Sequence, residues 1–234
     1  MAAPTFIAAG DGIAAQAADI AVAYMGSLVA DDLLIIHQTA EDGADVANTV
    51  PSGWTEIYDD FASGINSYVL ARKSDGTETG TVTLTLPVGA GIHSARMYQF
   101  RGWLQDATWA NNFEGAGTGE GIDETIEQPS ITTTDVDRLC VALVAVIDDN
   151  ALDAFTGMTG GTWAEPVAEF TTALGNDHAI GIQTATLAAA GTISGGVDTM
   201  AVADAWFVRT FAIKPAGGAP ANKRRYTLTT QGVG

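Results

Sequence analysis

Strict alternation of apolar and polar residues is the feature that most restricts how this chain can fold. Residues 81–86 read Thr-Val-Thr-Leu-Thr-Leu, which places the apolar side chains on one face and the threonines on the other. A helix needs apolar residues three and four apart, so this spacing predicts a half-buried β-strand. Further strands are predicted at 33–38, 54–58, 68–72, 95–101, 125–133, 139–147, 179–184 and 205–213.

Short strands separated by glycine-rich turns are typical of a sandwich. We therefore predict an all-β protein, an antiparallel β-sandwich of jelly-roll type. The Ser-Asp-Gly sequence at 74–76 predicts a hairpin that folds the strand at 81–86 back on 68–72. The alanine-rich segment 11–18 is the one place where a turn or two of helix is expected.

The chain resembles two similar halves placed in tandem. Four short sequence patterns that begin at residues 33, 53, 67 and 95 recur in the same order 106 to 110 residues later. A period this long is unlike a solenoid repeat and favours a duplicated set of strands packed face to face. We predict one sandwich domain at 1–214, with halves at about 1–115 and 122–214. The alternative is that any sandwich spaces its strands in this way.

The glycine-rich run at 115–121 lies at the junction of these halves. It has no P-loop lysine, and the residues after it do not predict a helix, so a phosphate-binding loop is not favoured. A flexible connection is expected instead. Residues 215–234 are predicted to be a linker followed by a basic tail.

Charge excludes several classes of partner. The chain has 10 Lys and Arg against 28 Asp and Glu, a net charge of -18. Such a surface repels phosphate backbones and anionic headgroups, so neither nucleic acid nor a membrane is expected as a partner. The N-terminus lacks the cations of a signal peptide, and no transmembrane helix is expected. The lone cysteine, Cys140, lies in an apolar run and is predicted to be buried.

No motif in the sequence indicates catalysis. The three histidines, His37, His93 and His178, are far apart in sequence and lack zinc-ligand spacing, so a structural role is expected for each. Neighbouring acids could supply the two carboxylates of a glycosidase, but among 28 acids such pairs arise by chance. Segments 41–45 and 148–153 gather oxygen ligands without matching a calcium loop. We predict no enzyme activity, no cofactor and no metal.

The tryptophans allow a different function. Trp103 and Trp109 flank a polar segment and are expected to be the more exposed of the five tryptophans. Flat aromatic faces stack on sugar rings, so these two could bind a glycan, although core packing is the more common use of tryptophan.

A series of turn and core patterns resembles a known group of proteins. The patterns are Asp-Asp-Leu-Leu at 31–34, Pro-Ser-Gly-Trp-Thr at 51–55, Lys-Ser-Asp-Gly-Thr-Glu at 73–78, the alternating strand at 81–86, Arg-Met-Tyr-Gln-Phe-Arg-Gly at 96–102, and Pro-Ser-Ile-Thr-Thr-Thr at 129–134. Together they are similar to β-sandwich structural proteins of tailed bacteriophages, over residues 30–214. The resemblance implies a non-enzymatic virion component, of head-decoration, head-fibre or tail-accessory type, that is usually oligomeric.

The basic tail lies outside that resemblance. Lys223, Arg224 and Arg225 are followed by Tyr226 and Leu228 in an alternating sequence that could add a strand to a neighbouring subunit. A frayed, solvated tail is the alternative. We expect an oligomeric assembly module on the surface of the virion, made in the host cytoplasm, whose partners are other virion proteins and further copies of itself, with a trimer as one form. A glycan-binding module is the second hypothesis and a polysaccharide-cleaving enzyme the third.

Overall fold

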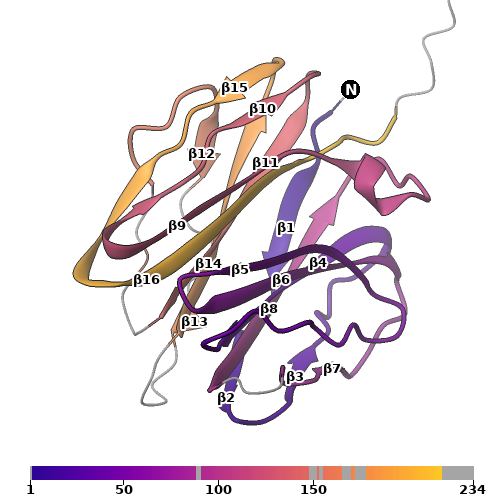
Figure 1. Ribbon diagram of the computed structural model, residues 1–234. Coiled ribbons are helices and arrows are strands. Elements are labelled where there is room, and N and C mark those ends of the chain that lie inside the picture. Colours follow the sequence, from indigo (N-terminus) through magenta and orange to yellow (C-terminus); the bar gives the residue numbers. More distant parts are fainter. Residues whose placement is uncertain are drawn as a thin grey trace, which may run out of the picture.

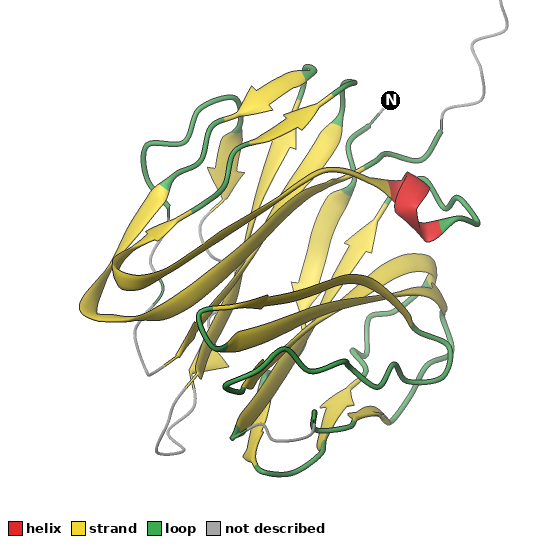
Figure 2. Cartoon of the chain, viewed as in Figure 1, coloured by secondary structure: helices red, strands yellow, loops and turns green. Residues whose placement is uncertain are grey.

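Two large antiparallel sheets, packed face to face, make up most of the molecule (Figures 1 and 2). The computed structural model describes residues 2–87, 91–147, 152, 155–164, 170–171 and 178–217. Within these residues the one helical element is a short 3-10 turn, η1 (Trp109–Asn112), drawn red in Figure 2. The prediction of an all-β antiparallel sandwich is confirmed, whereas its jelly-roll type stays a prediction.

The first sheet has six strands, and all of them lie before residue 102. Its order is β1-β8-β4-β6-β5, with β2 also paired to β8. The strands are β1 (Thr5–Ala9), β2 (Ile13–Gln16), β4 (Ala30–Glu41), β5 (Thr55–Ala62), β6 (Ile65–Asp75) and β8 (Ile92–Arg101).

The second sheet also has six strands, in the order β12-β14-β11-β16-β9, with β13 also paired to β14. They are β9 (Phe113–Glu127), β11 (Arg138–Ile147), β12 (Thr162–Ala164), β13 (Phe170–Thr171), β14 (His178–Leu187) and β16 (Val197–Ile213). Two small sheets complete the fold: β3 (Ile20–Ala23) pairs with β7 (Thr81–Leu84), and β10 (Ile131–Thr133) pairs with β15 (Gly191–Ile193).

Both sheets use the same strand order relative to the chain. In the first sheet β1 pairs with β8 and β8 pairs with β4, and β6 and β5 follow outward. In the second sheet β9 pairs with β16 and β16 pairs with β11, and β14 and β12 follow outward. Across the interface β4 faces β11, β6 faces β16, and β8 faces β14. These facing pairs correspond to an approximate two-fold axis that runs along the strands between β4 and β11. Duplication of one half stays a prediction.

Both faces of the central strands are buried. Leu33, Ile35 and Val141 lie in the core between the two large sheets, whereas Leu34 and Ile36 pack outward against β3 and β7. The outer face of the second sheet is covered in the same way, and Cys140 is fully buried there, as predicted. A strand with a core on each side has no polar face, which is why 33–36 and 139–147 are continuous apolar runs rather than alternating ones.

Three local predictions are wrong, and a fourth is correct only in part. Residues 13–16, expected to be helical, form β2 along β8, because pairing and packing override the helix propensity of alanine. The hairpin between 68–72 and 81–86 does not form, since β6 pairs with β4 and β5, and β7 pairs with β3. The run at 115–121 is not a flexible connection but part of β9, so the second sheet begins at Phe113. The predicted strand at 125–133 is divided between β9 and β10.

Candidate functional site

Both ends of the described chain lie at one end of the molecule, at the upper right in Figure 1. Residues 214–216, which follow β16, are hydrogen-bonded to residues 102–104, which follow β8. The Leu104 amide donates to the Lys214 carbonyl at 3.0 Å, and the Ala216 amide donates to the Gly102 carbonyl at 2.6 Å. Gly102 also lies against Pro4 near the N-terminus. These contacts fix the position of residues 214–216 beside the start of the chain.

Trp103 and Trp109 stabilise this same end. Their rings stack 5.4 Å apart with an interplanar angle of 9°. The Trp103 ring is only 1% exposed, and its indole N–H donates to the Asp31 carbonyl at 2.7 Å. The prediction that Trp103 is exposed is therefore wrong, because the ring closes the core between the sheets. Trp109, on η1, is half-buried and stays partly accessible.

A hollow beside η1 contains the accessible part of Trp109. It has a volume of about 180 Å³ and is lined by Trp109, Ala110 and Phe113 together with Glu56, Ile57 and Tyr58 of β5. Its lining thus combines three aromatic side chains, Tyr58, Trp109 and Phe113, with the carboxylate of Glu56. No sequence pattern indicated this combination, because η1 and β5 are about fifty residues apart.

The edge strand of the second sheet, β9, carries many exposed side chains. Among the described residues, β9 has one strand partner, β16, and lies outermost in its sheet. Ile122 on β9 is 71% exposed and Val202 on β16 is 59% exposed, the two highest values among the large apolar residues. Glu120, Glu124 and Glu127 are exposed on the same strand. This surface is therefore acidic with an apolar centre, and sequence reasoning missed it because 115–121 was interpreted as a connection.

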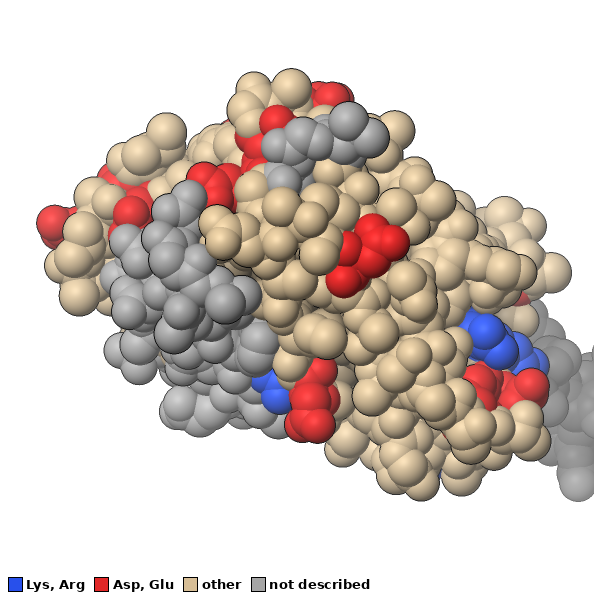
Figure 3. All heavy atoms as spheres, turned by 90° about the horizontal axis from the view of Figure 1, so that it is seen from below, with Lys and Arg blue, Asp and Glu red and all other residues tan. Residues whose placement is uncertain are grey.

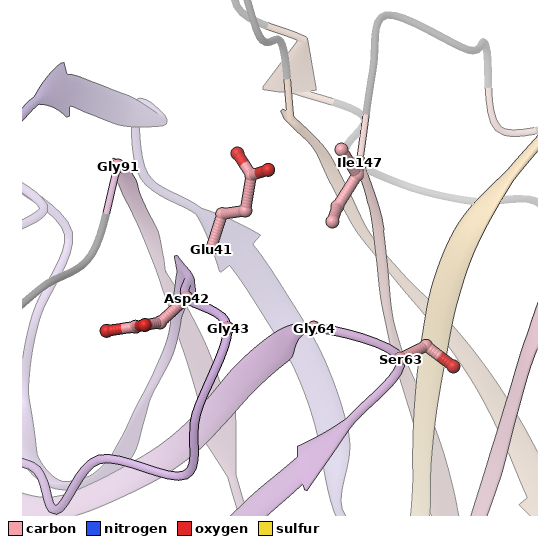
Figure 4. A pocket seen from close by; sticks show the side chains of 7 residues that line it. All are labelled: Glu41, Asp42, Gly43, Ser63, Gly64, Gly91 and Ile147. Carbon is pink, nitrogen blue, oxygen red and sulfur yellow. The ribbon is translucent and has the colours of Figure 1, made fainter.

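At the opposite end from the termini, an acidic hollow of about 430 Å³ opens between the two sheets. It is lined by Glu41, Asp42 and Gly43, by Ser63 and Gly64, and by Gly91 and Ile147. Figure 4 shows the Glu41 side chain extending toward the gap between Gly91 and Ile147, while Asp42 is directed away from it. The oxygen-rich segment 41–45, for which no metal was predicted, contributes Glu41, Asp42 and Gly43 to this hollow, and the side chains of Glu41 and Asp42 point in different directions.

The described residues contain no group of three or more His, Cys, Asp or Glu side chains that could hold a metal ion. Segment 148–153 lies largely outside the described residues, which include only Leu152 of it.

Acidic side chains near β5 are close enough to affect one another. The pKa of Asp59 is raised to about 6, first by partial burial and then by the charges of Glu56, Asp45 and Asp60.

The three histidines are all buried, in agreement with a structural role. His178 Nδ1 lies 2.9 Å from Ser94 Oγ across the interface between the sheets, and His37 Nε2 lies 3.0 Å from Ser67 Oγ. Burial lowers the pKa of His37 to about 3 and that of His93 and His178 to about 4. All three rings are therefore neutral at pH 7.

The remaining predicted site residues are Lys223, Arg224, Arg225, Tyr226 and Leu228, which lie outside the described residues. Two observations on the whole chain complete this account. No helix among the described residues is long and apolar enough to cross a bilayer. No family model matches the chain, and neither a curated protein nor a solved structure matches it.

Proposed function

We propose that the chain is a non-enzymatic structural protein of a tailed-bacteriophage virion, an oligomeric β-sandwich module that decorates or assembles the capsid or tail. The observation that carries this proposal is the position of the chain ends. Residues 2–4 and 214–217 leave the sandwich at the same end. A body held from one end presents the rest of its surface outward, which suits a protein whose task is attachment.

The packing between the sheets supports a mechanical role. The interface carries a continuous apolar core together with an ion pair between Arg209 of β16 and Asp60 of β5, in which the guanidinium makes two hydrogen bonds to the carboxylate. Arg209 also lies over the Tyr58 ring, 4.4 Å from its centroid. Such contacts between the halves favour a single stiff unit over two hinged ones. The resemblance of residues 30–214 to phage sandwich proteins points to the same function.

Removing the tail tests this proposal. The variant that ends at residue 217 keeps the Ala216 and Leu104 hydrogen bonds that close the fold. We expect it to fold normally but to be absent from particles purified after infection of cells that supply it in place of the full chain. Immunoblots of the purified particles measure the amount of this chain relative to a capsid protein. Incorporation equal to that of the full chain would show that the tail has no role in attachment.

Glycan binding is a second candidate, favoured by the hollow beside η1. Tyr58 and Trp109 offer rings on which a sugar could stack, and Glu56 offers a hydrogen-bond acceptor for its hydroxyls. In this proposal Trp103 holds the Trp109 ring in place by stacking against it and does not contact the ligand. Glycan-array binding that is lost in Trp109→Ala and kept in Trp163→Ala would support it. An array without any positive signal for the intact protein would contradict it.

A further inference from the structure

The outer edge of β9 can accept another strand. A strand at the border of a sheet has backbone N–H and C=O groups that point away from its single neighbour, and these form a template for pairing. β9 is 15 residues long, and its described pairing is to β16 alone. It is longer than any strand of the first sheet.

β9 lacks two residue types that commonly block an edge strand. Natural edge strands are commonly blocked by lysine or proline, and residues 113–127 contain no Lys, Arg or Pro. Its exposed side chains include Ile122 and four acids, namely Glu120, Asp123, Glu124 and Glu127. In Figure 3, which views the molecule from below, acidic side chains stand at the left margin, the side on which β9 and β16 curve outward in Figure 1.

The chain itself contains a segment of complementary chemistry. Residues 218–234 carry Lys223, Arg224 and Arg225 and no acid, in a chain whose net charge is -18. The cations are followed by Tyr-Thr-Leu-Thr-Thr, a sequence of strong β formers with apolar residues two apart. An extended strand rises by about 3.3 Å per residue, so residues 223–230 would cover roughly 26 Å of the β9 edge.

A second copy fits this role better than the same chain does. The chain leaves β16 at Ile213, which is paired with Phe113 at the start of β9. A tail that turned directly onto the edge of its own β9 would run in the same direction as β9, in the less stable parallel pairing. The tail of another copy can approach from the far end and pair antiparallel. We propose that residues 218–234 of one copy add an antiparallel strand to the β9 edge of a second copy.

This inference rests on the proposed function, since it names the contact through which the module would assemble with itself. Each copy has one tail and one β9 edge. Two copies can therefore exchange tails in a closed dimer, or each copy can bind the next through its tail around a ring. In an antiparallel register that places Tyr226 or Leu228 beside Ile122, the three consecutive cations of the tail would lie opposite residues 123–127, over Glu124 and Glu127. Such pairing is weakened by salt, because it joins exposed charges.

Charge reversal on each side of the contact tests the proposal. Sedimentation velocity of the full chain should show an oligomer that dissociates as salt is raised. The tail variant K223E/R224E/R225E and the edge variant E120K/E124K/E127K should each sediment as monomers when alone. An equimolar mixture of the two should associate again, because the acidic tail meets a basic edge and the basic tail meets an acidic one.

A substitution at the centre of the edge supplies the control for apolar contact. Ile122→Lys should abolish association, whereas Val29→Lys, at a valine that is 47% exposed in the other half of the molecule, should leave it intact. A monomeric wild type, unchanged mass in the tail variant, or a mixture that stays monomeric would each overturn the proposal. Incorporation into particles separates this result from the proposed function. A chain that enters particles while it is monomeric in solution contradicts only the β9 contact. A chain that associates in solution but never enters particles contradicts only the virion role.

Discussion

A single buried carboxylate organises the end of the molecule where the termini meet. Asp32 is fully buried and accepts two hydrogen bonds from Arg101, one from the Gln99 amide and one from the Val29 backbone N–H. Burial alone would raise its pKa, but these hydrogen bonds hold the pKa below its usual value. The neighbouring residue, Asp31, supplies the carbonyl that Trp103 binds, so the start of β4 and the turn after β8 are fixed together.

Replacing Asp32 should therefore be costly. We expect Asp32→Ala to lower the free energy of unfolding by about 2–3 kcal/mol, because buried donors lose their acceptor. Lys73→Ala is the control, since it breaks the exposed ion pair between Lys73 and Asp31 and should cost less than about 1 kcal/mol. Urea unfolding curves for the two variants measure the difference. Equal midpoints would mean that the Asp32 contacts contribute no more than a surface ion pair.

At the scale of single elements, packing explains why glycine occupies every second position from 115 to 121 in β9. A Cβ atom on Gly121 would lie 2.7 Å from the Trp206 ring, and one on Gly119 would collide with the Glu127 carbonyl. A Cβ on Gly117 would crowd Pro129. One face of the strand must be bare so that Trp206 and the segment after β9 can lie directly on it.

Filling that face should destabilise the second sheet. Gly121→Ala is expected to cost about 1–3 kcal/mol, because the added methyl group must displace a packed indole ring. Gly26→Ala serves as the matched control: nothing lies within 4 Å of its added Cβ, and the expected change is within about 0.5 kcal/mol. Thermal unfolding monitored by circular dichroism compares them. A Gly121→Ala protein as stable as Gly26→Ala would contradict this account of the glycine pattern.

The same strand shows what the sequence could and could not predict. Strands 33–38, 95–101 and 139–147 were predictable, because alternation and continuous apolar runs depend on local sequence alone. The strand at 115–121 was not, since the reason for its glycines is the ring of Trp206, some 85 residues later in the sequence. For the candidate site, the sequence indicated the basic tail and Trp109, but the acidic edge beside Ile122 required knowing which strand lies outermost.

At the scale of the whole molecule, the buried histidines link stability to pH. His37, His93 and His178 have pKa values of about 3, 4 and 4 in the folded chain, well below the value of 6.5 for an unburied imidazole. Between pH 6.5 and 4 the unfolded chain therefore binds protons that the folded chain does not, and folding becomes less favourable as the pH falls through this window. Asp59, with its pKa raised to about 6, acts in the opposite direction, but it is one group against three.

We therefore expect the urea midpoint to fall clearly between about pH 7 and about pH 4.5. His178→Gln removes one of the three groups and should reduce the size of that fall, even if it lowers stability at pH 7. Lys73→Ala, which changes no group that titrates in this range, should leave the fall unchanged. A midpoint independent of pH, or a fall of the same size in His178→Gln, would show that these imidazoles do not control acid stability.

The stacking of β4 on β11 about an approximate two-fold axis has a further consequence. A homodimer of half-length chains with this axis would offer two equivalent flanks and two equivalent trailing peptides. The continuous chain has only one trailing peptide, so its flanks are no longer interchangeable. In the assembly proposed above, a ring of such chains would have polarity, because each unit would bind one neighbour through its tail and the other through its β9 edge.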